Sequence, residues 1–257
     1  MVFNLFFVFK GVNMIIKSKE NELIKKTIKL KDKKYRKEFG KFLVEGEKSL
    51  LEAYKNGYRI NTIFITEKLN NDFGNVSICE VSNDVMKAIS TTATIPKCVG
   101  VVEMKEPSKC EIKSNFLVLD RLQDPSNVGA IIRSALGADF TKVILIDCAD
   151  VYDSKVIRSS MGAVFNVDIY KSTLDDVLKM NFPLVVMDMN GENIFKANFD
   201  KNTIYGFVVG NEGQGVCKEL KAKATKTVAI PMNSKLESLN AAVSASIVMY
   251  TISNIGR

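Results

Sequence analysis

The sequence of 257 residues contains no histidine and no tryptophan. Histidine is the commonest general base and the commonest metal ligand, so its absence excludes Ser–His–Asp, Cys–His and histidine-based zinc mechanisms. The five cysteines form no CxxC pair and no metal-like spacing; they are Cys79, Cys98, Cys110, Cys148 and Cys217. This odd, scattered set predicts reduced, buried thiols in a cytoplasmic protein, and we expect no metal.

Apolar runs long enough to span a bilayer are also missing. The first nine residues are strongly apolar, but they are too few to cross a membrane and lack the basic region and cleavage site of a signal peptide. We interpret residues 1–18 as a tail, whose first 13 residues come from an upstream start codon or are disordered. The apolar run at 239–252 is interrupted by polar side chains. We therefore expect no membrane partner.

Positive charge is concentrated near the N-terminus. The net charge is +7, and residues 1–60 hold 15 Lys and Arg against 7 Asp and Glu, whereas the remaining residues hold 21 against 22. A localised basic surface is the electrostatic footprint of a protein that binds a phosphate backbone. A lysine-rich helix that is merely solvated has the same composition, so charge alone leaves both interpretations open.

The patterning divides the chain into two α/β units. Residues 19–104 contain a lysine-rich helical stretch followed by short strands and helices, which predicts a small α/β domain. Residues 105–114 are polar, contain a proline and lack periodicity, as expected of a linker. In residues 115–257, strands alternate with helices, which predicts a mostly parallel sheet covered on both faces.

The elements expected in the second unit are six strands and five helices. The strands are residues 116–119, 142–146, 165–170, 184–187, 205–209 and 227–230. The helices are residues 126–138, 154–161, 173–180, 217–224 and 237–254. Three segments, at 119–133, 207–215 and 230–240, place polar residues and glycines directly after strands. Because ligands bind beyond the carboxyl ends of strands in open α/β sheets, we expect these three segments to meet in one pocket.

The middle segment is glycine-rich but does not match a nucleotide loop. The glycines of Gly210–Gly215 fall as GxxGxG, whereas the dinucleotide fingerprint is GxGxxG. The GxxxxG spacing of a P-loop is present, but Val216 and Cys217 stand where its Lys and Ser or Thr belong. An NTPase or a dehydrogenase is therefore disfavoured. The glycines still allow a ligand to approach the backbone closely.

The outer two segments carry polar residues at helix starts. Ser126 or Asn127 is expected to cap the helix at 126–138, whose apolar sequence makes Arg133 costly unless it is paired or belongs to a site. Ser238 and Asn240 are expected on the first turn of the helix at 237–254, where unpaired backbone N–H groups attract polar ligand atoms. Each feature alone has an ordinary explanation as a cap, a turn or a surface residue.

Together, and in this order, the three segments resemble the signature motifs of the SpoU (TrmH-type) RNA ribose 2′-O-methyltransferases of the SPOUT superfamily. The resemblance covers residues 116–256 and includes Lys155–Ala163 between the first two motifs. Residues 19–104 resemble the family's small L30e-like substrate-binding domain through Lys41–Gly46 and Ile89–Pro96. Asn233 and Ser234 depart from the family pattern, in which glycine is common there.

The resemblance implies an α/β domain with a C-terminal trefoil knot that binds S-adenosylmethionine, and a homodimer. It implies RNA as the substrate, and the L30e-like unit favours 23S ribosomal RNA over tRNA. The cofactor contacts that it implies are Val209, Gly210, Ile230, Ser238 and Leu239, mostly through backbone groups. The alternatives are a tRNA ribose 2′-O-methyltransferase and an RNA-binding relative without activity.

The catalytic residues implied by the resemblance are Arg133, Asn127, Glu212 and Asn240. The family gives Arg133 the role of activating the ribose hydroxyl, although a guanidinium is effectively always protonated. Arg133 can equally stabilise the developing alkoxide or hold a phosphate, with Glu212 either orienting it or accepting the proton. Asn127 and Asn240 are neutral, and we assign them to positioning the ribose or Arg133.

Overall fold

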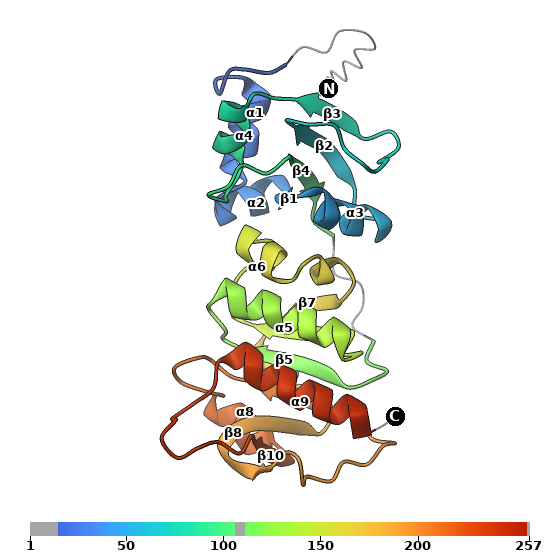
Figure 1. Cartoon of the computed structure of the whole chain (residues 1–257). Helices are drawn as coiled ribbons and strands as arrows, with labels where there is room; N and C mark the ends of the chain where they lie inside the picture. Colours follow the sequence, from blue (N-terminus) through green and yellow to red (C-terminus); the bar gives the residue numbers. More distant parts are fainter. Residues whose placement is uncertain (1–14, 106–110, 256–257) are drawn as a thin grey trace.

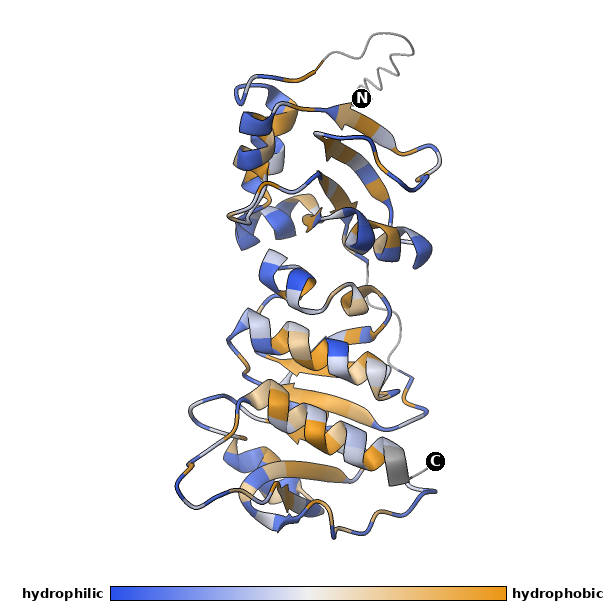
Figure 2. Cartoon of the chain, viewed as in Figure 1, coloured by the Kyte–Doolittle hydropathy of each residue, from blue (hydrophilic) through white to orange (hydrophobic). Residues whose placement is uncertain are grey.

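The computed structural model describes residues 15–105 and 111–255, which form two sheets stacked along the molecule (Figure 1). The expectation for residues 1–13 and that for Cys110 lie outside the described residues. Figure 2 shows apolar residues concentrated on the strands and on the helix faces that cover them, as expected for two buried sheets.

The N-terminal unit is a four-stranded sheet of order β1-β4-β2-β3, in which only β2 and β3 pair in parallel. Its elements are α1 (Glu22–Lys29), α2 (Lys33–Phe39), β1 (Lys41–Glu45), α3 (Glu47–Lys55), β2 (Ile60–Ile65), β3 (Ser77–Glu80), α4 (Asn83–Ile89) and β4 (Cys98–Glu103). One face of the sheet packs against α1 and α4 through Ile24, Phe64 and Met86. The lysine-rich stretch is two helices, because the Asp32 side chain caps a new helix by accepting a hydrogen bond from the N–H of Lys34.

The C-terminal unit is a six-stranded sheet of order β10-β8-β9-β5-β6-β7, and every neighbouring pair is parallel. Its strands are β5 (Phe116–Asp120), β6 (Lys142–Ile146), β7 (Asp168–Ser172), β8 (Leu184–Asn193), β9 (Gly206–Val209) and β10 (Lys226–Ala229). Its helices are α5 (Pro125–Gly137), α6 (Ser154–Ser159), α7 (Leu174–Lys179), α8 (Lys218–Lys223) and α9 (Ala241–Ile255). Helices α5 and α9 cover one face, and α7 and α8 cover the other. The prediction of a mostly parallel sheet covered on both faces is confirmed.

Some boundaries predicted from the sequence are wrong. The strand expected at 165–170 begins at Asp168, and Ala163–Phe165 forms a 3-10 turn instead. The reason is tertiary, because the Phe165 ring packs against Phe42 and Tyr58 of the N-terminal unit. The last helix begins at Ala241 and not at 237, so Ser238 and Asn240 precede it. Strand β8 continues six residues beyond the expected end at 187, because it stays paired with β10 after a register shift.

The two units share one apolar core. The rings of Phe42 and Tyr152 lie 4.5 Å apart between centroids, and those of Tyr58 and Phe165 lie 5.0 Å apart. Beside this core, the buried Arg36 guanidinium donates to Asp150 at 2.9 and 3.1 Å. The units are therefore packed together, and a change of their relative position requires a buried ion pair to break.

Candidate active site

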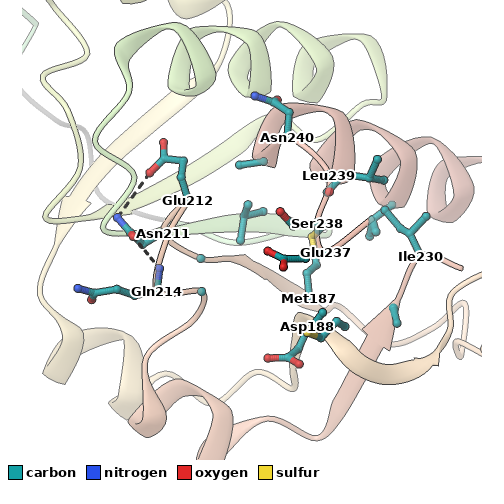
Figure 3. A pocket seen from close by; sticks show the side chains of 18 of the residues that line it. Met187, Asp188, Asn211, Glu212, Gln214, Ile230, Glu237, Ser238, Leu239 and Asn240 are labelled. Atoms are coloured by element: carbon teal, nitrogen blue, oxygen red, sulfur yellow. Dashed lines mark hydrogen bonds between the residues drawn. The ribbon is translucent and has the colours of Figure 1, made fainter. Parts of the chain in front are cut away.

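A cavity of about 940 Å³ lies beyond the carboxyl ends of β9 and β10 and beside the middle of β8 (Figure 3). All three segments singled out in the sequence contribute to it. Its lining includes Asn127, residues 187–190, residues 209–215, residues 228–230 and residues 237–241. The prediction that the three segments meet in one pocket is confirmed. The volume is that of a site for a small molecule of cofactor size.

A chain of hydrogen bonds joins the three segments at the pocket wall. Asn240 Nδ2 donates to Asn127 Oδ1 at 2.9 Å, and Asn127 Nδ2 donates to Glu212 Oε1 at 3.2 Å. Asn240 Oδ1 also accepts from the N–H groups of Ala242 and Val243, so it caps α9. Since both amides use their donor and their acceptor in this chain, each has one fitting orientation.

The cap of α5 differs from the sequence-based expectation. Asp124 occupies the cap position, and its carboxylate accepts from the N–H of Ser126 at 2.8 Å. Neither Ser126 nor Asn127 is the cap. Asn127 lies in the first turn with 7% of its surface exposed, and its amide is free to serve the pocket because Asp124 satisfies the helix end.

The Glu212 carboxylate is held by four donors. They are the N–H groups of Gln123 and Asp124 and the side-chain amides of Asn127 and Asn211. Burial raises the pKa of Glu212, but hydrogen bonds from its own backbone N–H and from these donors together outweigh burial and hold the pKa below its ordinary value. A carboxylate with a lowered pKa is a poor proton acceptor at neutral pH. The arrangement therefore indicates that Glu212 anchors two loops to each other and does not act as a general base.

The glycine-rich loop is closed tightly. Asn211 and Gly215 exchange backbone hydrogen bonds of 2.9 and 3.1 Å, and a Cβ at Gly210 would overlap the backbone of Gly215 and Val216. Asn211 Oδ1 accepts from the N–H groups of Gly213 and Gln214 inside the loop (Figure 3). Only glycine at 210 permits this closure.

Arg121 and Asp120 hold the same loop from outside. Arg121 is a non-glycine residue at φ 57°, and its guanidinium donates to Gln214 Oε1 and to the Gly215 carbonyl. The buried Asp120 carboxylate accepts from Arg121 and from the N–H of Cys217 at 2.7 Å. A non-glycine residue with positive φ persists only when its surroundings enforce it. This pair was not singled out from the sequence, because both residues precede the stretch Asp124–Gly129 that drew attention to the segment.

The remaining pocket residues are apolar or acidic. Met187, Val209, Ile230 and Leu239 supply apolar surface, as Figure 3 shows in part. Two further carboxylates, those of Asp188 and Glu237, lie among the lining residues, and Lys221 pairs with Asp188 at 2.5 Å. The Lys221 bond lowers the pKa of Asp188 despite partial burial. Asp188 and Glu237 were not singled out from the sequence; the position of Asp188 directly after an apolar run was the available signal.

Arg133 lies apart from the other predicted catalytic residues. It is exposed on α5, does not line the pocket, and makes no hydrogen bond or ion pair with any described residue. Glu212 therefore does not orient Arg133 within one chain. The other predicted site residues, Asn127, Glu212, Asn240, Val209, Gly210, Ile230, Ser238 and Leu239, all line the pocket.

The described cysteines are free thiols, but the expectation that they are buried holds only for Cys98, since Cys79, Cys148 and Cys217 are partly exposed. Burial raises the pKa of Cys98 and of Cys148 to about 12, so both remain protonated at neutral pH. Among residues 15–105 and 111–255, no group of three or more acidic or cysteine side chains is arranged to hold a metal ion. Within the same ranges, no helix is both long and apolar enough for a membrane span.

Residues 114–250 match the SpoU rRNA methylase family, and residues 21–100 match the MRM3-like substrate binding domain. The chain belongs to the SpoU rRNA methylase family. In this SpoU protein, the family match begins just before β5. It includes the three residues that hydrogen bonds join at the pocket wall, Asn127, Glu212 and Asn240.

Relatives of this SpoU chain cover more than nine tenths of its length. The 23S rRNA (guanosine(2553)-2'-O)-methyltransferase RlmP of Bacillus subtilis is 30% identical over 91% of this chain and 97% of the relative. A crystal structure of an RNA 2'-O ribose methyltransferase is 28% identical, with a TM-score of 0.83 and coverage of 95% of this chain and 99% of the other. AviRb from Streptomyces viridochromogenes, solved with AdoMet, is 25% identical, with a TM-score of 0.80 and coverage of 91% and 98%.

Proposed function

We propose that the protein transfers a methyl group from S-adenosylmethionine to a ribose 2′-hydroxyl of 23S ribosomal RNA. The observation that carries the proposal is the pocket itself, in which Asn127, Glu212 and Asn240 form one hydrogen-bonded chain beside a glycine-closed loop. Membership of the SpoU family supports the reaction class, and the similarity to a 23S rRNA 2′-O-methyltransferase supports the substrate.

The pocket fits S-adenosylmethionine in size and in chemistry. The cofactor carries a cationic sulfonium and an ammonium group, and the pocket carries the carboxylates of Asp188, Glu212 and Glu237 against one lysine. Its apolar lining suits an adenine ring, and the closed loop at Gly210 lets a ligand meet backbone atoms. Val209, Gly210, Ile230, Ser238 and Leu239 would hold the cofactor. When bound, S-adenosylmethionine supplies the electrophilic methyl group.

The protein's part is to position the ribose and to manage the proton of its 2′-hydroxyl. Asn127 and Asn240 present amides of fixed orientation at the pocket wall, where they would position the ribose. Glu212 holds these amides in place, and its lowered pKa assigns it this anchoring role. Two requirements remain: an acceptor for the 2′-hydroxyl proton, which we assign to solvent water at the pocket, and a cation that stabilises the developing alkoxide, which we assign to Arg133.

Arg133 would meet this requirement from a second copy of the chain. It stands on the exposed face of α5, next to α9, where Val243 and Tyr250 are 48% and 46% exposed. A partly apolar face with one unpaired cation suits an interface, and a homodimer related by twofold symmetry would give each pocket the same partner residue. The homodimer thus explains why Arg133 is absent from its own pocket.

We also propose that residues 115–257 form the methyltransferase domain with a trefoil knot, and that residues 19–104 form an L30e-like substrate-binding domain joined by residues 105–114. The strand order β10-β8-β9-β5 and the packing of α9 on α5 support the first assignment. The match to an MRM3-like substrate binding domain over residues 21–100 supports the second. A knot would place the loops at 210–215 and 231–240 against each other, as a bent cofactor requires.

The test is a transfer assay with methyl-labelled S-adenosylmethionine on unmodified ribosomal RNA and on tRNA, followed by alkaline hydrolysis. We expect label in alkali-resistant dinucleotides from ribosomal RNA, because a methylated 2′-oxygen cannot assist cleavage. Label in tRNA alone would replace the substrate but keep the reaction. Label on a base would contradict the mechanism, and absence of cofactor binding would contradict the proposal as a whole.

A further inference from the structure

The exposed surface formed by α1 and α2 carries lysines without acidic partners. We call Lys29, Lys33, Lys34 and Lys37, together with the rings of Tyr35 and Phe39, the α1–α2 patch. All four lysines are exposed. Among the described residues, the ion pairs of these two helices involve only Lys25 and Arg36. The nearby acids are Asp32, which caps α2, and the exposed Glu38. The patch therefore has a surplus of unpaired positive charge.

Two aromatic rings lie within this charge. Tyr35 and Phe39 stack at 5.9 Å between centroids and 29° between planes, and Phe39 is 37% exposed. Lys29 of α1 and Lys34 of α2 lie over the Tyr35 ring at 5.2 and 5.6 Å. Lysines around an accessible aromatic ring are the chemistry that binds single-stranded nucleic acid, in which phosphates meet cations and bases stack on rings.

The opposite face of α2 fixes the patch relative to the pocket. Arg36 is 4% exposed and bonds Asp150 and Asp153, and Asp153 caps α6. Helix α6 then packs on α5, where a Cβ at Gly129 would overlap Ser159. Gly129 is two residues from Asn127 in the pocket wall. In Figure 1, α2 and α6 lie on the side of the molecule where the loop preceding α9 also emerges.

We infer that the α1–α2 patch binds the sugar–phosphate backbone and one unpaired base of the substrate RNA, at a distance from the target ribose. The inference rests on the proposed function and adds the surface by which the substrate is held. Because Arg36 locks α2 to the catalytic unit, the patch sets a fixed spacing between the anchored nucleotide and the methylated one. The strand between them would pass over α6, which carries Lys155 and Arg158.

The first experiment removes three patch charges. The variant Lys33→Ala, Lys34→Ala, Lys37→Ala is compared with Lys179→Ala, Lys196→Ala, Lys201→Ala, which removes the same charge from exposed positions in the C-terminal unit. Binding of an unmodified ribosomal RNA fragment is measured by filter binding over a range of salt. Each phosphate contact on a single strand contributes about 0.7 to the slope of log affinity against log salt, so the patch variant should lose about 2 from that slope. The control variant should keep the wild-type slope.

The aromatic part is tested with matched substitutions. Tyr35→Ala should weaken RNA binding about tenfold, whereas Tyr35→Phe keeps the ring and should bind as the wild type does. In the triple lysine variant and in Tyr35→Ala, the KM for RNA should rise. The kcat and the affinity for S-adenosylmethionine should stay unchanged, because the patch does not touch the pocket. A patch that merely keeps the protein folded would instead lower kcat and the melting temperature together.

The outcomes separate this inference from the proposed function. If the wild type methylates ribosomal RNA and the patch variant has the same RNA affinity and salt slope, the inference is wrong and the function stands. If the patch variant loses binding to vesicles of anionic lipid and not to RNA, the patch is a membrane surface and the inference is also wrong. If the wild type binds S-adenosylmethionine and no RNA of either class, the proposed function itself fails.

Discussion

At the scale of single residues, the pocket separates groups that hold the loops from groups that act on the substrate. Glu212, Asp120 and Arg121 hold loops, because each is committed to hydrogen bonds with backbone or amide groups of neighbouring segments. Arg133 makes no such bond with a described residue. Arg133 lies six residues after Asn127 on α5, and a cation that the fold leaves unpaired is available for a ligand or a partner chain.

Arg133→Ala should abolish methyl transfer and leave S-adenosylmethionine affinity unchanged. The decisive measurement mixes subunits of Arg133→Ala with subunits of Glu212→Gln after both are unfolded and refolded together. If Arg133 acts on the partner's pocket, half of the dimers contain one fully native site, and about a quarter of wild-type activity returns. If Arg133 acts within its own chain, no site is complete and no activity returns, which would contradict the assignment.

Arg121→Asn should weaken S-adenosylmethionine binding about tenfold, because Gln214 and Gly215 lose a charged donor. Asparagine tolerates the left-handed region that Arg121 occupies at φ 57°, so the substitution removes the guanidinium without adding backbone strain. Isothermal titration with the cofactor checks the result. Wild-type affinity in this variant would show that the loop at 210–215 holds its shape without Arg121.

Glu212 gives stability a dependence on pH. Its folded pKa is below the ordinary value of 4.5, so its bonds stabilise the fold above that value, and the contribution disappears as pH falls through the folded pKa. The melting temperature of Glu212→Gln should lie below that of the wild type by a constant amount from about pH 7 to about pH 5, and the gap should close in stronger acid. A gap that persists in acid would show that the Glu212 charge is not what holds the loops.

At the scale of elements, the pocket depends on where three segments end. Asp124 caps α5, Asn240 caps α9, and the loop after β9 closes on itself, so each segment enters the pocket with its backbone already satisfied. Side chains that are not needed as caps are then free to face the cavity. Asn240 alone does both, since it caps α9 and lines the pocket, so a substitution there affects the helix end and the site.

Substitutions of Asn240 should separate its two roles. Asn240→Ala removes the cap of α9 and the donor to Asn127, and should cost about 1 kcal/mol of unfolding free energy together with most of the activity. Asn240→Ser keeps a capping oxygen but is too short to reach Asn127, so stability should return while activity stays low. Urea denaturation and the transfer assay measure the two effects. Full activity in the serine variant would contradict a positioning role for Asn240.

At the scale of the whole molecule, two sheets act as one body. The aromatic cluster of Phe42, Tyr58, Tyr152 and Phe165 joins both units, and Arg36 adds a buried ion pair beside it. A protein that must place one nucleotide of a long RNA in its pocket gains selectivity from a fixed distance between the gripping surface and that pocket. Under the proposed function, this junction would hold the α1–α2 patch at a fixed distance from the pocket.

Arg36→Met should destabilise the protein by about 3 kcal/mol, because it leaves the buried carboxylate of Asp150 with only a longer ion pair, to Lys171 at 3.8 Å, and the N–H of Tyr152. The double variant Arg36→Met, Asp150→Leu removes both charges and should recover most of this loss. Lys97→Ala, which breaks an exposed pair with Glu67, serves as the control and should cost less than about 1 kcal/mol. Urea unfolding measures all three. A single variant as stable as the wild type would show that the junction does not depend on this ion pair.

The class of fold, the order of the elements and the three segments of the pocket could be predicted from the amino acids alone. These follow from local patterns: apolar β-branched strands, helical periodicity, and glycines where the backbone must close, as at Gly210. Asn127, Glu212 and Asn240 lie in these segments and were assigned through the resemblance of the segments to the family's motifs, and the structure brings them together.

Features that depend on contacts between distant segments could be recognised only in the folded molecule. Phe165 leaves its expected strand because it packs on Phe42, 123 residues earlier in the chain. Arg121 adopts a strained backbone because Gly215 and Gln214 accept its donors, and Arg36 is buried because Asp150 is there to receive it. The free energy that fixes these residues comes from partners far away in sequence, so no local pattern could reveal it.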